Sequence, residues 1–322
     1  MRRRLSSPPV DLSVKVLSIV DPLHGILVVD LTRYLPGPFA SRELLRLGAR
    51  VVRLEAPPGD PVRDIAPDWD ARLNGGKESV LWDARADPAL GRALCRRADV
   101  VLEGFRPGVA ARLGVGPDDV PDTTVYCSLT GFGEGDARAG HDLNYLGWAG
   151  ALEPTAPGMP PLPIADLAGG ALSTVARILA ALLERERTGR GARIVVSMTH
   201  ESHELARYST PLTGELACYR IYECADGRYV TVAALEPKFW VRLCELLERP
   251  DLAGRSHDAH EELEALFRTR TSDEWLGLLA REDTMVGPVA SLAEAEAEFG
   301  SPPPSARPPR PGEHTHAWRA VL

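Results

Sequence analysis

The sequence lacks several features that would place the protein in other classes. Its five cysteines never show the Cys-x-x-Cys spacing of zinc and redox sites, so we expect reduced thiols in the cytoplasm. The formal net charge is −8 without a compensating basic face, which argues against a nucleic-acid partner. No apolar run reaches membrane-spanning length, and no signal-peptide core follows the basic start Met-Arg-Arg-Arg. We therefore expect a cytoplasmic protein with no membrane partner.

Chain length and apolar content are sufficient for two domains. The 322 residues exceed the usual size of one domain, and apolar residues make up 44% of them. From Gly25 onward, strand-like and helical segments alternate, which predicts an α/β domain with a parallel sheet and right-handed crossovers. The expected strands are 26–31, 50–54, 99–103, 124–129 and 193–198, and the expected helices are 39–47, 88–97 and 166–187.

The second half of the chain has a different pattern. Two apolar segments, 219–224 and 228–233, flank Ala-Asp-Gly and predict a β-hairpin, and helices are expected at 237–247 and 271–280. The proline-rich residues 301–311 predict an extended crossing segment. The expected organisation is a flexible extension at 1–22, a large domain at 23–200, an irregular polar linker at 201–216, a small α+β domain at 217–295, and a segment at 296–322 that returns to the large domain.

Two side chains that can transfer protons near neutral pH stand in distinctive settings. His141 lies in a polar, glycine-containing stretch, and Asp166 precedes a long apolar helix. The simpler interpretations are a surface histidine and a helix N-cap. Taken separately, neither residue identifies a catalytic site.

A series of ordered motifs resembles the α-methylacyl-CoA racemases, which belong to the family III CoA-transferases (CaiB/BaiF). The resemblance runs from about Leu27 to the C-terminus. It implies a Rossmann-like large domain, a small α+β domain and an interlocked homodimer with its active site between domains of the two chains. The motifs lie at 29–33, 36–38, 48–53, 103–108, 140–145, 166–170, 225–229, 234–240 and 312–315.

The resemblance implies chemistry at the α-carbon of an acyl-CoA thioester. His141 and Asp166 would exchange the roles of acid and base on opposite faces of an enolate. Glu236 would reach His141 and set its tautomer, from the partner chain if the dimer is interlocked. Backbone N–H groups near the helix after Asp166 would stabilise the enolate oxygen. No cofactor is expected beyond the CoA of the substrate.

The same resemblance assigns residues to CoA. Arg106 and Arg112 would bind its phosphates, and Asp142 and Tyr145 would contact the pantetheine end. The chain departs from the family pattern at Ala56, where many relatives carry a basic residue. The expectation is either weaker binding of CoA or substitution by Arg53 or Arg63. The segment 199–215 is also shorter than in typical relatives, which leaves the acyl specificity open.

Other interpretations compete with a racemase. A family III CoA-transferase would use Asp166 as a nucleophile, although the combination of His141 with Glu236 favours the racemase. A family member that binds thioesters without turnover also remains open. A dinucleotide-dependent oxidoreductase is excluded because no Gly-x-Gly-x-x-Gly follows the first strand. The short histidine spacings at 200–203, 257–260 and 314–316 lack His-Glu-x-x-His, so no metal site is expected.

Overall fold

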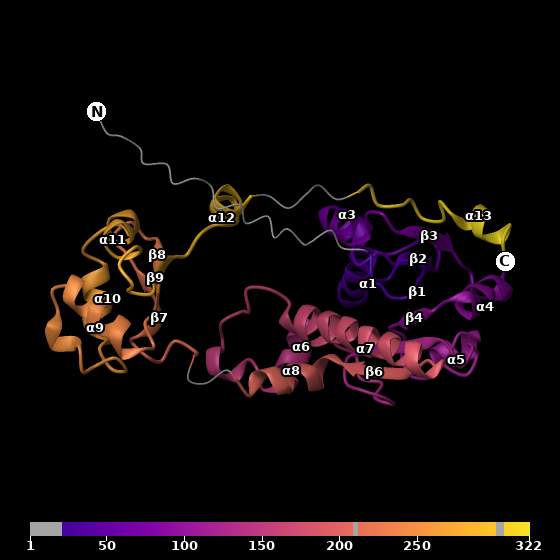
Figure 1. Ribbon diagram of the computed structural model, residues 1–322, viewed down its shortest axis with the longest axis horizontal. Coiled ribbons are helices and arrows are strands. Elements are labelled where there is room, and N and C mark those ends of the chain that lie inside the picture. Colours follow the sequence, from indigo (N-terminus) through magenta and orange to yellow (C-terminus); the bar gives the residue numbers. More distant parts are fainter. Residues whose placement is uncertain (1–20, 209–211, 301–305) are drawn as a thin grey trace. The chain divides into compact units, whose positions relative to one another are not determined.

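The computed structural model describes residues 21–208, 212–300 and 306–322, so most of the expected N-terminal extension lies outside the described residues. The chain forms two compact units (Figure 1). Of the described residues, 21–153, Pro157–Ala206 and 306–322 belong to the first unit, and Pro154–Ala156, 207–208 and 212–300 belong to the second.

The first unit is built on a parallel six-stranded sheet, which confirms the predicted α/β class. Its order is β3-β2-β1-β4-β5-β6, and the direction of strand addition reverses between β1 and β4. In such sheets ligands bind beside the carboxyl ends of the strands near this reversal. The strands are β1 (Leu27–Asp30), β2 (Arg50–Glu55), β3 (Glu78–Leu81), β4 (Val100–Glu103), β5 (Val125–Thr130) and β6 (Arg193–Ser197).

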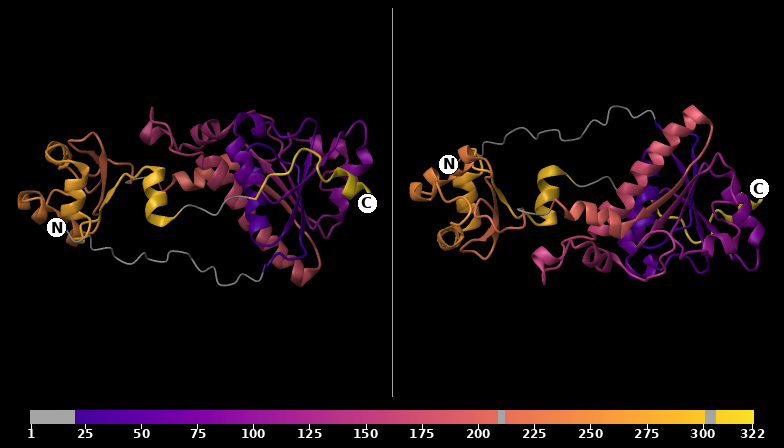
Figure 2. Two further views of the ribbon diagram at one scale, coloured as in Figure 1. Left: turned by 90° about the horizontal axis from the view of Figure 1, so that it is seen from above. Right: turned by 90° about the horizontal axis from the view of Figure 1, so that it is seen from below.

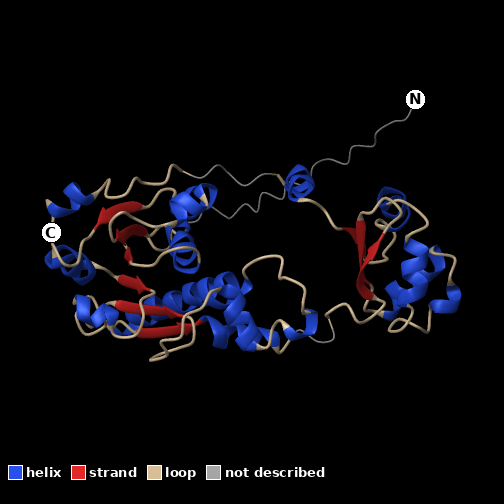
Figure 3. Ribbon diagram, turned by 180° about the vertical axis from the view of Figure 1, so that it is seen from behind, coloured by secondary structure: helices blue, strands red, loops and turns tan. Residues whose placement is uncertain are grey.

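Helices cover both faces of this sheet (Figures 2 and 3). Neighbouring strand residues point to opposite faces, so Val28 packs in one core and Val29 in the other. The Val28 core includes side chains of α1 (Pro36–Arg46), η2 (Ala165–Leu172) and α7 (Ser173–Thr188). The Val29 core includes side chains of α4 (Pro88–Arg97), α5 (Val109–Leu113) and α13 (Thr315–Arg319). Further helices of this unit include α2 (Val62–Ile65), α3 (Pro67–Asn74) and α6 (Asp142–Ala149).

One helical stretch, Ala165–Thr188, is long and apolar enough to cross a membrane by length and composition, contrary to the sequence expectation. Ile178 and Leu182 of this stretch are buried in the core that contains Val28. A buried core helix meets the same criterion, and 39% of the apolar part of this stretch is buried, so packing against the sheet accounts for part of its apolar character.

The second unit is a small α+β domain, as predicted. An antiparallel sheet contains β7 (Tyr219–Glu223), β8 (Tyr229–Ala233) and β9 (Val286–Pro288). Gly227 has φ +72° in the turn between β7 and β8, which confirms the predicted hairpin. The helices are α9 (Pro237–Leu246), α10 (His260–Phe267), α11 (Ser272–Leu279) and α12 (Leu292–Phe299).

The expectation of an irregular segment after residue 200 is wrong for its first part. Residues up to 206 belong to helix α8 (Met198–Ala206). Met198 and Ser202, one turn apart, are buried, and their atoms lie against Gly169 and Gly170 of η2. The sequence of this helix is mostly polar and only a few of its residues are buried, so no apolar periodicity indicated a helix.

The described C-terminal segment lies along the edge strand β3. The His314 N–H donates to the Ser79 carbonyl at 2.9 Å, and the Ser79 N–H donates to His314 Nδ1 at 3.1 Å. The Leu81 N–H donates to Thr315 Oγ1 at 3.0 Å. These bonds satisfy backbone groups that an uncovered edge strand would leave open.

A buried lysine fixes the start of α1 against the carboxyl end of β1. Lys77 is enclosed, and its Nζ donates to the Pro38 carbonyl, Ser41 Oγ and Asn74 Oδ1 at 2.8, 2.7 and 3.0 Å. The Asp30 carboxylate lies 3.8 Å away. Burial lowers the pKa of Lys77 to about 7, and the attraction of Asp30 opposes this change.

We expect Lys77→Met to lower the free energy of unfolding by about 3 kcal/mol, because buried acceptors lose their donor. Between pH 7 and about 10 the unfolded chain holds a proton that folded Lys77 has lost, so this group makes stability rise with pH there. Urea unfolding of both proteins across this range measures the two effects. As a control, Arg193→Gln removes an exposed ion pair with Asp118 and should cost less than about 1 kcal/mol.

Candidate active site

His141 stands immediately before α6, after the loop that follows β5. Its backbone is extended, with φ −127° and ψ 177°, as is usual for a residue that precedes a helix. Its N–H donates to Asn144 Oδ1 at 3.0 Å, which fixes the residue at the helix start. The residue is exposed, so its imidazole is open to a substrate.

Asp166 lies in the first turn of η2, a π-helical segment that continues into α7. Such wide turns are uncommon in proteins and are frequent at functional sites. Burial, together with the smaller effect of the nearby Asp142 carboxylate, raises the pKa of the Asp166 carboxyl to about 7. The carboxyl can therefore be present in both its acid and its base form near neutral pH.

Asp142 joins the segments that carry these two side chains. It follows His141 directly, and its Oδ1 accepts the Asp166 N–H at 2.8 Å. The structure thereby brings the beginnings of α6 and η2 together at one site. The carboxylate that was predicted to contact pantetheine is engaged with the backbone of Asp166.

The backbone N–H groups at the start of η2 are already bonded. The Asp166 N–H donates to Asp142, and the Leu167 N–H donates to the Pro163 carbonyl at 3.0 Å. The prediction that they stabilise an enolate is therefore not supported by the geometry. At the start of α6, by contrast, the N–H groups of Asp142 and Leu143 have no hydrogen-bond acceptor within the described residues. These two groups are available to an oxyanion.

Two glycines allow α8 to approach the helix that carries Asp166. A Cβ at Gly169 would lie 2.7 Å from Ser202 Oγ and 3.1 Å from the Met198 carbonyl. A Cβ at Gly170 would lie 2.9 Å from Met198 Cγ. Side chains at these two positions would collide with α8, so both glycines are needed for α8 to pack closely against the helix that carries Asp166.

The residues predicted to bind CoA are in different environments. Arg106 and Arg112 are exposed near the carboxyl end of β4, where their guanidinium groups are accessible to an anion. Tyr145 is buried, and its hydroxyl donates to the Gly140 carbonyl, so it supports the loop before His141. Because the hydroxyl is already bonded and the residue is buried, the structure does not support the predicted contact of Tyr145 with pantetheine.

Arg53 does not present its guanidinium group to solvent, contrary to the expectation that it replaces the basic residue missing at position 56. Its side chain is 0% exposed, and Nη2 donates to Asp60 Oδ2 at 2.6 Å. Arg63 is engaged as well, because it donates to both oxygens of Glu55. The carboxylates that neutralise both cations lie nearby in the sequence, but only the fold brings them into contact.

Comparisons with known proteins identify the family. Residues 23–300 match the sequence profile of CoA-transferase family III. The human "Alpha-methylacyl-CoA racemase" is 33% identical over 308 residues, which cover 84% of this chain and 78% of the relative. The "Acetyl-CoA:oxalate CoA-transferase" of Acetobacter aceti is 31% identical over 323 residues, covering 85% and 82% of the two chains. The crystal structure of Rv3272 from Mycobacterium tuberculosis superposes with a TM-score of 0.79 at 28% identity, covering 92% and 99%.

The chain belongs to CoA-transferase family III. This confirms the resemblance inferred from the ordered motifs. The protein is thus an enzyme of a superfamily that contains both racemases and CoA-transferases, and acyl-CoA thioesters suit it as substrates. Relatives of the two kinds have similar identity to the chain, so the family alone does not choose between the two reactions.

Glu236, the third residue predicted for this family III site, is in the second unit. It is exposed and directly precedes α9, with an extended backbone at φ −78° and ψ 135°. His141 and Asp166 belong to the first unit. The pairing of Glu236 with His141 therefore stays a prediction.

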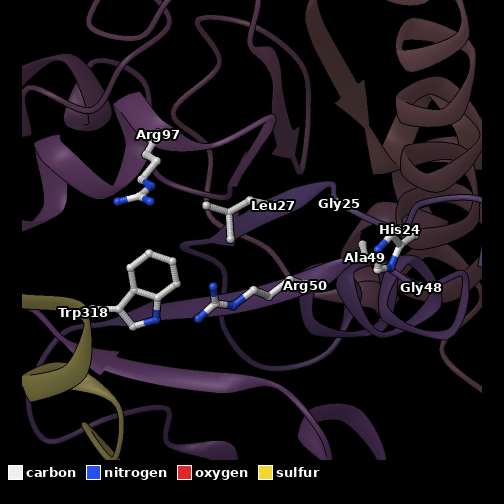
Figure 4. A pocket seen from close by; sticks show the side chains of 8 residues that line it. All are labelled: His24, Gly25, Leu27, Gly48, Ala49, Arg50, Arg97 and Trp318. Carbon is white, nitrogen blue, oxygen red and sulfur yellow. The ribbon is translucent and has the colours of Figure 1, made fainter. Parts of the chain in front are cut away.

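A cavity of about 390 Å³ lies at the opposite end of the sheet from this site, at the amino ends of β1 and β2 (Figure 4). Its two guanidinium groups already have partners. Arg50 pairs with Glu78 at 2.6 Å and lies over the Trp318 ring, and Arg97 donates to the Val321 carbonyl at 2.7 Å. The volume alone does not make this cavity a second binding site.

Sequence reasoning missed two residues beside the family III site. Tyr34, in the connection between β1 and α1, lies edge-on to His141, with ring centroids 6.4 Å apart. The carboxylate of Asp60, in the loop after β2, accepts the backbone N–H of Tyr34. The only sequence signal was their position after apolar strands, because the carboxyl ends of parallel strands gather at the ligand-binding edge.

Proposed function

We propose that the protein is an acyl-CoA racemase that inverts an α-methyl or otherwise α-branched thioester by 1,1-proton transfer. The observation that carries the proposal is the raised pKa of Asp166, about 7, beside the segment that carries His141. A carboxyl group whose pKa is raised to near neutrality can serve as acid or base, and an imidazole side chain can also take either role.

Racemisation requires each of these groups to take either role. For one enantiomer, Asp166 as carboxylate removes the α-proton and the bond electrons pass to the thioester oxygen. The protonated His141 then donates a proton to the opposite face of the enolate. The other enantiomer reverses the roles. The N–H groups of Asp142 and Leu143 at the start of α6 would stabilise the enolate oxygen, because they are free and lie beside His141.

A CoA-transferase is the second candidate, because relatives of that activity match the chain almost as well. In that reaction the Asp166 carboxylate attacks the thioester carbonyl and releases CoA as the thiolate. The thiolate then attacks the Asp166 carbonyl of the resulting mixed anhydride, which releases the first carboxylic acid and leaves CoA as a thioester on Asp166. An incoming carboxylate attacks this thioester and releases the CoA thiolate again. The thiolate finally attacks the acyl carbonyl of the second anhydride, which gives the new acyl-CoA and free Asp166. His141 has no proton to move at carbon in this scheme.

We further propose that two copies of the chain assemble and that Glu236 of the partner subunit orients His141. Glu236 is exposed and lies at the start of a helix, where a second chain could meet it. All five cysteines are free and buried, which supports the cytoplasm as the compartment.

The test of function is α-proton exchange of 2-methylacyl-CoA in D₂O, followed by NMR with chiral analysis of the product. Exchange together with loss of optical purity supports the racemase. Transfer of CoA to an added carboxylic acid, without exchange, supports the transferase. Absence of both reactions with a series of thioesters would contradict the two proposals.

The pH dependence of racemisation is expected to change in Asp142→Asn. Removal of the neighbouring negative charge lowers the pKa of Asp166 from about 7, while the asparagine oxygen can still accept the Asp166 N–H. For the enantiomer deprotonated by Asp166, activity falls as pH drops through this pKa, so the acid limb moves to lower pH. Profiles of kcat/KM measure the change, and Asp118→Asn is the exposed control. A shift to higher pH, or none, contradicts the assigned role.

A further inference from the structure

Tyr34 has an unfavourable backbone conformation for an aromatic residue. Its φ is +66°, in the left-handed region where a Cβ is poorly tolerated and glycine is preferred. It lies in the short connection between β1 and α1, at the carboxyl edge of the sheet. Conformations of this kind persist where the surrounding structure enforces them, and they cluster at functional sites.

The enforcing contact comes from a buried ion pair. The Tyr34 N–H donates to the Asp60 carboxylate, with distances of 3.1 and 3.3 Å to its two oxygens. Asp60 is 3% exposed, accepts the Val62 N–H at 3.0 Å, and is bonded to the enclosed Arg53. Arg53 thus acts in this structure as the anchor of a loop at the site.

The anchored backbone directs the Tyr34 ring toward His141. The two ring planes meet at 89°, with the edge of one facing the other. Tyr34 is 43% exposed, so the ring lines open space beside the imidazole and is not part of the core. Among the described residues, Tyr34 is the aromatic side chain in ring contact with His141.

We propose that Tyr34 is a specificity-determining residue and that Asp60 is the residue that positions it. The ring limits the room beside His141 for the acyl group of a CoA thioester, so compact α-branched acyl groups are preferred over bulky ones. The inference rests on the proposed function, because it takes His141 to meet the α-carbon of the substrate.

The test compares kcat/KM for 2-methylbutanoyl-CoA and 2-phenylpropanoyl-CoA in the wild type and in Tyr34→Gly. Glycine suits the positive φ, so this variant should fold while it loses the ring. We expect the ratio of bulky to compact substrate to rise about tenfold or more, the size of effect that a pocket wall produces. Tyr34→Phe keeps the ring and should keep the ratio within about threefold.

Asp60→Asn tests the positioning role. The amide can still accept the Tyr34 N–H but no longer neutralises Arg53, so the ratio should move in the same direction as in Tyr34→Gly, by a smaller factor. An unchanged ratio in Tyr34→Gly, with proton exchange intact, overturns the inference. So does an equal change of the ratio in Tyr34→Phe.

A failure of the proposed function is distinguishable from a failure of this inference. If the wild type exchanges the α-proton of neither thioester, the racemase proposal fails. The preference for the compact over the bulky thioester is then measured as the ratio of their dissociation constants, by calorimetry. NMR gives a readout without substrate, because removing the ring should move the Cε1 proton signal of His141 in Tyr34→Gly but not in Tyr34→Phe. An unmoved signal shows that the ring does not lie beside His141 in solution and overturns the inference.

Discussion

Asp166→Asn is expected to lower the rates of α-proton exchange and of any CoA transfer, each by about 10³-fold or more. Asparagine has nearly the same shape as aspartate but can neither accept the α-proton nor form an anhydride. Because Asp166 is half-buried and its backbone N–H is held by Asp142, the substitution should leave the local fold intact. Rates are measured by NMR in D₂O and by transfer to an added carboxylic acid.

The matched control for this variant is Asp136→Asn. Asp136 is an aspartate in the loop before His141, and it pairs with Arg138 at 2.7 Å on the surface. Its replacement should change either rate by less than about threefold. If Asp166→Asn retains exchange and inversion at the wild-type rate, Asp166 has no role in the reaction and both candidate functions lose their central residue.

His141→Gln is expected to lower the rate of racemisation by about 10³-fold while leaving CoA transfer, if the protein catalyses it, nearly unchanged. With one of the two groups missing, inversion cannot be completed. Asp166 can still remove the α-proton from the enantiomer that faces it and return a deuteron to the same face. We therefore expect exchange without inversion for one enantiomer and no exchange for the other.

Separate measurements on the two pure enantiomers reveal this asymmetry. His200→Gln is a suitable control, because His200 is an exposed histidine on α8 whose Nδ1 lies 2.7 Å from Ser197 Oγ. Equal racemisation in His141→Gln and in the wild type would rule out the two-group mechanism. If the wild type transfers CoA to a carboxylic acid without any α-proton exchange, and His141→Gln keeps this transfer, the protein is a transferase instead.

The parts of the fold that could be predicted from the sequence are those with a clear periodicity of apolar residues. Apolar strands such as β2 and β4 alternate with amphipathic helices, and this periodicity is sufficient to predict a parallel sheet. Strand β3 was missed because its four residues include Glu78 and Ser79, whose polar groups are satisfied by partners distant in the sequence. Helix α8 was missed for a similar reason, since its buried side depends on close packing with η2.

The sequence by itself determined the alternation of strands and helices, the hairpin and the family, because these depend on periodicity, turn residues and ordered motifs. It also pointed to His141 and Asp166. Only the tertiary structure decided their environment. The pKa of Asp166 depends on burial and on Asp142, and Arg53 is neutralised by Asp60. The position of Tyr34 depends on the same carboxylate. Electrostatic free energies are set by distance and burial, and both are fixed only when the chain has folded.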